Sequence, residues 1–276
     1  MKSSDETGAR MQMKHYLDQL VLRFEQEPFI QDDPISIPHG FNDPRDQEIA
    51  GFLVALLAWG QRKTILNKMA DWIARMQFSP YEFVRRFDET RNTDALLGFK
   101  HRTFNDGDAI WLTKALSAML HRYDTLENAF STHLLPHATD VQAAIQGFST
   151  EMMTILPDTP QRLQKHLARP NTGSACKRLN MFLRWMVRGN SAVDLGIWRH
   201  ISPRQLVLPL DVHSGRQARR IGILKRPQDD WRAAIELTEA CRQFDANDPA
   251  KYDFAFFGLG VYGDEEFPHK KSGQLL

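Results

Sequence analysis

The sequence has few cysteines, no long apolar run and little that resembles a β-strand. Cys176 and Cys241 are its only cysteines, which excludes an iron–sulfur cluster held by four cysteines and a zinc site built mainly from thiolates. No stretch reaches the roughly 18 uncharged apolar residues that a membrane-spanning helix needs. The polar start of the chain, residues 2–10, lacks the apolar core of a signal peptide. We therefore expect a cytoplasmic protein, since a reducing compartment suits such sparse thiols.

Helical periodicity runs through most of the chain. The best strand-like segment, residues 205–210, fits a buried connection as well. In residues 46–60 apolar side chains recur at steps of three and four, with Asp43 and Pro44 as a start and Gly60 as a stop. Similar patterns predict helices over residues 14–26, 63–76, 80–87, 107–123, 125–134, 141–156, 161–168, 174–187, 214–221, 227–243 and 251–258. The sequence therefore predicts an all-α protein.

Acidic residues are scarce between residues 161 and 226, which hold 14 lysines and arginines but only Asp194 and Asp211. The segment is net +12 within a chain of net charge +1, so the remainder is net −11. One interpretation is a cationic face that binds a polyanion such as nucleic acid. The other is a solvated surface with acidic neighbours elsewhere in the fold, and the charge pattern alone leaves both open.

Two short motifs suggest sites that the chain does not support. Residues 258–263, "GLGVYG", satisfy the glycine pattern of a dinucleotide-binding loop. Only 13 residues follow, too few for the helix and parallel strand that such a site needs, so a helix end with a turn is the better interpretation. His133 and His137 are four residues apart, but Pro136 between them disrupts a shared helical face, so we predict no metal site.

Lys177 and Asp211 are the residues that most suggest chemistry. Lys177 falls in the first turn of a predicted helix, where the positive end of the helix dipole disfavours its charge. An uncharged lysine is an amine nucleophile, although an ordinary surface lysine fits too. Asp211 precedes a predicted helix and suits its N-cap. A carboxylate held by backbone N–H groups stays ionised and oriented, so a cap can also serve in catalysis.

The pairing "GSACK…LPLDVH" resembles the active-site segment of the helix-hairpin-helix DNA glycosylases, the superfamily of endonuclease III and the 8-oxoguanine glycosylases. By this resemblance Lys177 is the catalytic lysine and Asp211 the catalytic aspartate. His213 then lies near the DNA backbone, and Gly173 matches the first glycine of the hairpin, whereas Ala175 replaces the second. The spacing of 34 residues is closest to the archaeal-type 8-oxoguanine glycosylases.

The likeness covers residues 170–222 well and 45–260 more loosely. Phrases such as "YDFAFFGLGVYG" also resemble an uncharacterised bacterial family of the same superfamily, a domain of unknown function. The looser match implies one unit with two helical lobes beside a DNA-binding cleft, approximately residues 46–190 and residues 1–45 plus 191–276.

Further site residues follow from the resemblance. Gln61, at a helix–helix corner, would fill the gap left by a flipped base, or else lie at a solvent-exposed corner. Phe257 would stack on the base and Asp253 would read it, with core packing and ordinary surface as their alternatives. Trp59 is a second stacking candidate that also suits the core. Arg178 and Arg216 are expected to contact DNA.

The resemblance implies a DNA glycosylase with AP-lyase activity, acting on double-stranded DNA that contains a damaged base, 8-oxoguanine first among the possible lesions. Lys177 would attack C1′ and form a Schiff base, while Asp211 stabilises the positive charge on the sugar. No cofactor is required, and we expect a monomer associated with the nucleoid. The alternatives are a non-catalytic helical nucleic-acid-binding protein and an enzyme acting on a free nucleoside.

Overall fold

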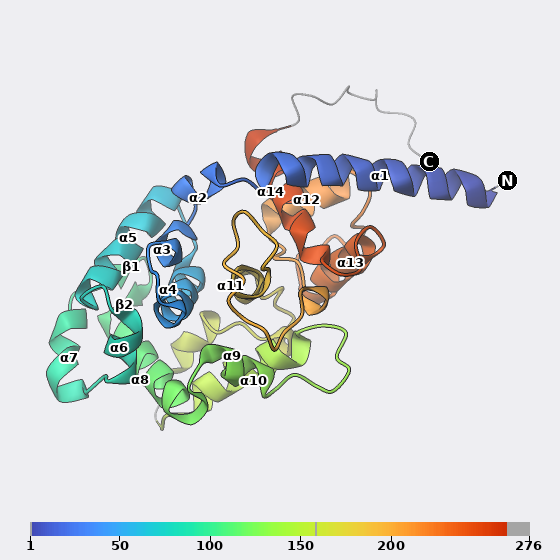
Figure 1. Ribbon diagram of the computed structural model, residues 1–276. Coiled ribbons are helices and arrows are strands. Elements are labelled where there is room, and N and C mark those ends of the chain that lie inside the picture. Colours follow the sequence, from blue (N-terminus) through green and yellow to red (C-terminus); the bar gives the residue numbers. More distant parts are fainter. Residues whose placement is uncertain (1, 158, 264–276) are drawn as a thin grey trace.

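Figure 1 shows the computed structural model, which describes residues 2–157 and 159–263, apart from the side chains of residues 2–6 and of residue 262. About 64% of the described residues are helical and 2% are in strands, which confirms the all-α prediction. The α-helices are α1 (Lys2–Phe24), α2 (Pro28–Asp32), α3 (Ser36–His39), α4 (Pro44–Leu57), α5 (Arg62–Arg75), α6 (Pro80–Arg85), α7 (Glu89–Leu96), α8 (Asp106–Tyr123), α9 (Leu126–Ser131), α10 (Gln142–Thr154), α11 (Lys177–Val187), α12 (Val212–Arg220), α13 (Trp231–Arg242) and α14 (Asp253–Tyr262).

Short 3₁₀ segments and one hairpin complete the described chain. The 3₁₀ segments are Gln161–Lys165, Pro170–Thr172, Pro203–Gln205 and Pro249–Tyr252. The antiparallel hairpin pairs β1 (Lys100–His101) with β2 (Phe104–Asn105). None of the described helices is long and apolar enough to cross a membrane.

Helix α11 lies near the centre of the view in Figure 1, with α4 to α8 on one side and α12 to α14 on the other. It packs against α4, while α12 and α1 both pack against α14. Apolar side chains of α11, among them Phe182, are buried against α4, where the ring centroid of Phe52 lies 5.4 Å from that of Phe182. Phe52 in turn contacts Phe148 of α10, with 5.5 Å between ring centroids. Burial of these rings holds the centre of the molecule together.

Local sequence explains where the main helices begin. Asp43 accepts a hydrogen bond from Arg45 N and Pro44 takes the first position of α4. Asn105 and Asp108 form a reciprocal capping box for α8. Asp230 caps α13 by accepting from Ala233 N. The helices predicted at these places therefore form, with ends that shift by a few residues.

Several expected elements differ from those observed. The first helix begins at Lys2 rather than at residue 14, and the segment expected as a helix over 161–168 is a 3₁₀ turn. Residues 205–210 form no strand: Gln205 ends a 3₁₀ segment, and the residues after it form a buried connection. Leu206, Leu208 and Leu210 are almost wholly buried there. The "GLGVYG" glycines 258 and 260 lie inside α14, which ends before Gly263 at φ +76°.

Candidate functional site

Lys177 is the first residue of α11, and the turn before it is tightly built. Cys176 and Gly173 adopt left-handed backbone conformations, with φ +50° and φ +82°. That region is uncommon for residues other than glycine, and burial of Cys176 holds it there. The side-chain amide of Asn180 donates to the Ala175 carbonyl at 3.0 Å and ties the turn to the helix. This packing fixes the point from which the Lys177 side chain extends.

Asp211 is the N-cap of α12, as its position in the sequence predicted. Its Oδ1 accepts hydrogen bonds from His213 N at 2.9 Å and from Ser214 N at 3.0 Å. Its Oδ2 lies 3.6 Å from Lys177 Nζ, and both side chains are about one-third exposed, at 31% and 32%. Helix α12 therefore orients the carboxylate while its second oxygen faces the amine.

The charge of Asp211 is favoured by its surroundings. Burial alone would raise the pKa of Asp211, but the Lys177 ammonium and the N–H groups of Ser214 and His213 outweigh it and lower the pKa below its ordinary value. Asp211 is therefore ionised at neutral pH. Lys177 and Asp211, 34 residues apart in the sequence, thus form an ion pair. Both side chains remain partly exposed, so a ligand can contact the amine and the carboxylate together.

A cavity of about 160 Å³ lies beside this pair. The wall combines aromatic rings with charged groups of both signs: Phe29, Phe254 and Phe257; Asp33, Asp211 and Asp253; Arg62, Lys177 and Arg184. Such a mixed pocket suits a flat, polar ring better than an aliphatic ligand.

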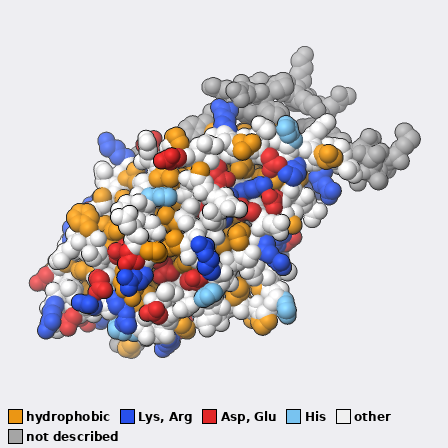
Figure 2. All heavy atoms as spheres, viewed as in Figure 1, with side chains coloured by type: hydrophobic (Ala, Val, Ile, Leu, Met, Phe, Trp, Pro, Cys, Tyr) orange, Lys and Arg blue, Asp and Glu red, His pale blue; other side chains and the backbone are white. Residues whose placement is uncertain are grey.

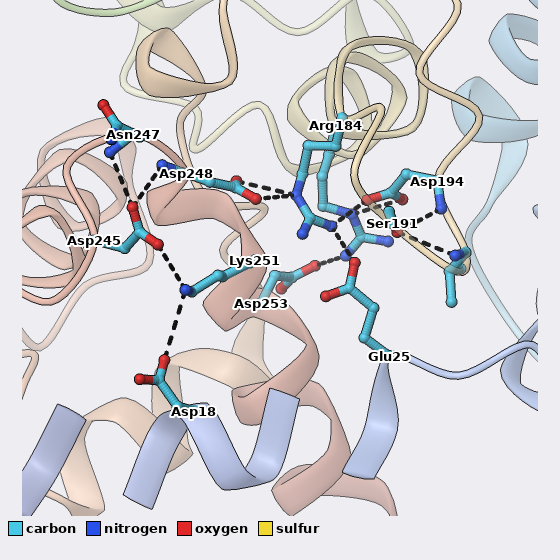
Figure 3. A network of polar contacts seen from close by, with 12 residues as sticks. Asp18, Glu25, Arg184, Ser191, Asp194, Asp245, Asn247, Asp248, Lys251 and Asp253 are labelled. Carbon is cyan, nitrogen blue, oxygen red and sulfur yellow. Dashed lines mark hydrogen bonds and ion pairs between the residues drawn. The ribbon is translucent and has the colours of Figure 1, made fainter. Parts of the chain in front are cut away.

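Asp253 and Phe257 both line this cavity. The expected alternative of an ordinary surface position for Asp253 is wrong, because the residue is buried and pairs with the Arg184 guanidinium, as Figure 3 shows. Burial raises the pKa of Asp253 to about 6, against the lowering effect of Arg184 and Lys177. Phe257 is only partly buried, and the Arg62 guanidinium lies 5.5 Å from its ring centroid.

Arg184 also pairs with Asp194, with Nε 3.2 Å from Oδ1. Its neighbour Arg188 pairs with Asp194, with Glu25 at 2.8 Å and with Asp248 at 2.9 Å. The network reaches from α11 to α1 and α14 and continues toward Lys251 in Figure 3. It anchors the helix that carries Lys177.

Two expected site residues lie elsewhere. Trp59 is not among the residues that line the cavity; its ring packs against His101 and His166, with centroids 5.2 and 5.9 Å apart. The Arg178 guanidinium donates to the carbonyls of Leu56 and Lys165, and this geometry favours a structural role over the expected contact with a DNA phosphate. Burial lowers the pKa of Arg178 to about 10.

The remaining residues expected to contact DNA are exposed. His213 and Arg216 lie on the outer surface of α12, and Gly173 precedes α11. Gln61 is exposed at the N-terminus of α5, between Gly60 and Arg62, which both line the cavity. Their proposed contacts with DNA stay predictions.

Asp33, Phe29 and Arg62 are wall residues that sequence reasoning missed. Asp33 and Phe29 come from the short, proline-bounded helices α2 and α3 and their junction, which have no amphipathic pattern. The one available signal was the Asp-Pro step at residues 33–34, since aspartate before proline favours a turn in which its side chain bonds a nearby backbone N–H.

Many charges of the basic segment are neutralised within the fold. Arg162 pairs with Asp108 and Arg219 with Asp229, each at 2.7 Å, and Arg226 pairs with Asp230. Arg184 and Arg188 are buried. For these arginines, the interpretation that acidic residues elsewhere in the fold neutralise the basic segment is therefore correct. On the face in Figure 2, basic and acidic side chains are interspersed.

The structure thus defines an all-α protein with a lysine–aspartate pair in the wall of an aromatic cavity. A family model described as "Protein of unknown function (DUF2400)" matches residues 33–262, and the chain belongs to that family. No curated protein and no solved structure matches the chain. The matched range includes Asp33, Lys177, Asp211 and α14.

Proposed function

We propose that this protein is a DNA glycosylase with AP-lyase activity that removes a damaged base, 8-oxoguanine being the favoured substrate. The observation that carries the proposal is the 3.6 Å separation of Lys177 Nζ and Asp211 Oδ2 in the wall of a cavity lined by aromatic rings. The resemblance of the two segments to the helix-hairpin-helix glycosylases supports the same chemistry. The nucleotide must leave the duplex to reach the pair, at a cost of a few kcal/mol.

Asp211 and Lys177 have different roles in the proposed reaction. Ionised Asp211 stabilises the positive charge that develops on the sugar as the C1′–N bond breaks. The Lys177 amine, once it has given up a proton, attacks C1′, and the bonding electrons leave with the base, which takes up a proton. Opening of the sugar ring gives a Schiff base between Nζ and C1′. Loss of a 2′ proton and of the 3′ phosphate then nicks the strand 3′ to the lesion.

Reductive trapping tests this proposal. With borohydride, the wild-type protein should form a covalent complex with duplex DNA that contains an abasic site, because borohydride reduces the Schiff base to a stable amine. Lys177→Gln should form none, whereas Lys225→Gln should trap as the wild type does, since Lys225 is exposed and outside the cavity wall. Undiminished trapping by Lys177→Gln would show that another amine acts.

A panel of oligonucleotides tests the substrate. It should include 8-oxoguanine opposite each base, uracil, abasic sites and alkylated purines. Base release from one lesion class supports the enzyme. Tight binding with neither release nor trapping would support a non-catalytic nucleic-acid-binding protein instead.

A further inference from the structure

Asp33 places a third carboxyl group in the cavity wall. It directly follows α2, and its Oδ1 accepts a hydrogen bond from Ile35 N at 3.1 Å. Among the residues that the structure describes, no donor bonds its Oδ2 and no cation forms an ion pair with it. Burial raises the pKa of Asp33, while the Ile35 N–H and then the positive charges of Arg184, Arg62 and Lys177 oppose this effect.

The other two wall carboxylates are already engaged by the protein. Asp211 accepts from the N-terminus of α12 and faces Lys177, and Asp253 is bound by Arg184. Asp33 is therefore the wall carboxyl with the most unused acceptor capacity. Asp33 is partly exposed, so a ligand in the cavity can reach its free oxygen and donate a hydrogen bond in place of water.

The acceptor character of Asp33 restricts which base edge can face it. A carboxylate offers two oxygens and no donor. A guanine-type edge carries adjacent N1–H and N2–H donors and matches both oxygens. An adenine-type or cytosine-type edge places a ring-nitrogen acceptor beside its amino group, and a uracil-type edge flanks one N–H with two carbonyls. Both of these latter arrangements bring lone pairs against the carboxylate.

We propose that Asp33 is the specificity-determining residue of this site, and that it accepts the N1–H and N2–H donors of a guanine-type base that packs against the ring cluster of Phe29, Phe254 and Phe257. The inference rests on the proposed glycosylase function. It explains why Asp33 forms no ion pair with a described residue although the wall holds as many cations as carboxylates. 8-Oxoguanine retains both donors and so belongs to this class.

The test compares Asp33→Asn with Asp32→Asn. Asparagine keeps an oxygen for the Ile35 N–H but presents an NH₂ group where the second acceptor was. Asp32 is the adjacent, exposed carboxylate and gives a matched control. Two substrates are used, 8-oxoguanine and 8-oxohypoxanthine, which lacks the 2-amino group, together with borohydride trapping on abasic DNA, which needs no base in the cavity.

The wild type and Asp32→Asn should excise 8-oxoguanine at least about tenfold faster than 8-oxohypoxanthine, the scale of one charged hydrogen bond. In Asp33→Asn this preference should fall at least fivefold, and excision should fall far more than abasic trapping. Because the preference is a ratio within one protein, partial misfolding does not imitate it. A preference unchanged in Asp33→Asn overturns the role of Asp33. Failure of the wild type to trap abasic DNA overturns the glycosylase proposal itself.

Discussion

Asp211 carries two roles that two substitutions can separate. In Asp211→Asn the side-chain oxygen can still accept from His213 N and Ser214 N, so the cap of α12 persists while the negative charge is lost. In Asp211→Ala both are lost. The N-cap contributes about 1 kcal/mol, so we expect Asp211→Ala to melt about 2–4 °C below Asp211→Asn. Base excision should fall at least about 100-fold in both variants, because the charge on the sugar loses its stabilising carboxylate.

The pH dependence of stability gives a further check on the same residue. The pKa of Asp211 in the folded protein is lower than its ordinary value of 3.8. A carboxyl whose pKa falls on folding adds stability above its unfolded pKa, and this contribution disappears as pH falls through the folded value. The stability difference between the wild type and Asp211→Asn should therefore be complete at pH 5–7 and vanish in stronger acid.

Urea denaturation and thermal melting measure the stabilities, and release of the base in a single turnover measures the chemistry. If Asp211→Asn excises bases within tenfold of the wild type, the carboxylate does not stabilise the transition state. Equal melting temperatures for the Asn and Ala variants would show that the cap contributes nothing.

Two other predictions concern the arginines. Arg188 has three carboxylate partners and a side chain that is 2% exposed. Replacing it with methionine should lower the free energy of unfolding by about 3–5 kcal/mol. As a control, Arg86→Met removes the exposed pair with Glu82 and should change the free energy of unfolding by less than about 1 kcal/mol. For DNA binding, Arg216→Ala should reduce the slope of log K against log salt by about one, whereas Arg178→Ala should leave that slope unchanged and lower the melting temperature. If the slope falls in Arg178→Ala and not in Arg216→Ala, then Arg178 rather than Arg216 contacts a DNA phosphate.

Much of the fold was predictable because its longest helices carry their own signals. Helix α4 has both an apolar repeat and an Asp-Pro start, and it forms with an end only three residues before the glycine expected to stop it. Helices α2, α3 and α7 were not predicted, since they are short and proline-bounded or largely polar. The hairpin of residues 100–105 has strands of two residues each, too short for an alternating pattern.

The site was predictable in part. The meeting of Lys177 and Asp211 was expected from the resemblance of two segments, and the cap at Asp211 from local sequence. The position of Asp33 depends on how the α2–α3 segment packs against α4, α5 and α14, which no local pattern encodes. For the same reason the pairing of Arg162 with Asp108 or of Arg188 with Glu25 could not be predicted, because each joins residues far apart in the chain.

Helix α11 contributes both to the cavity wall and to the buried ion-pair network. Lys177, Met181 and Arg184 all line the cavity, and their spacing of four and three residues places them on one face of the helix. Arg188 continues that face into the buried ion-pair network. The apolar face, which includes Phe182, packs against α4, so α11 is enclosed on both sides. Buried ion pairs contribute little net stability compared with apolar packing, but their geometry restricts how α11 can rotate or slide against α14. That restriction holds the Lys177 amine in line with Asp211, and it explains why a segment rich in arginine lies at the centre of the molecule rather than only on its surface.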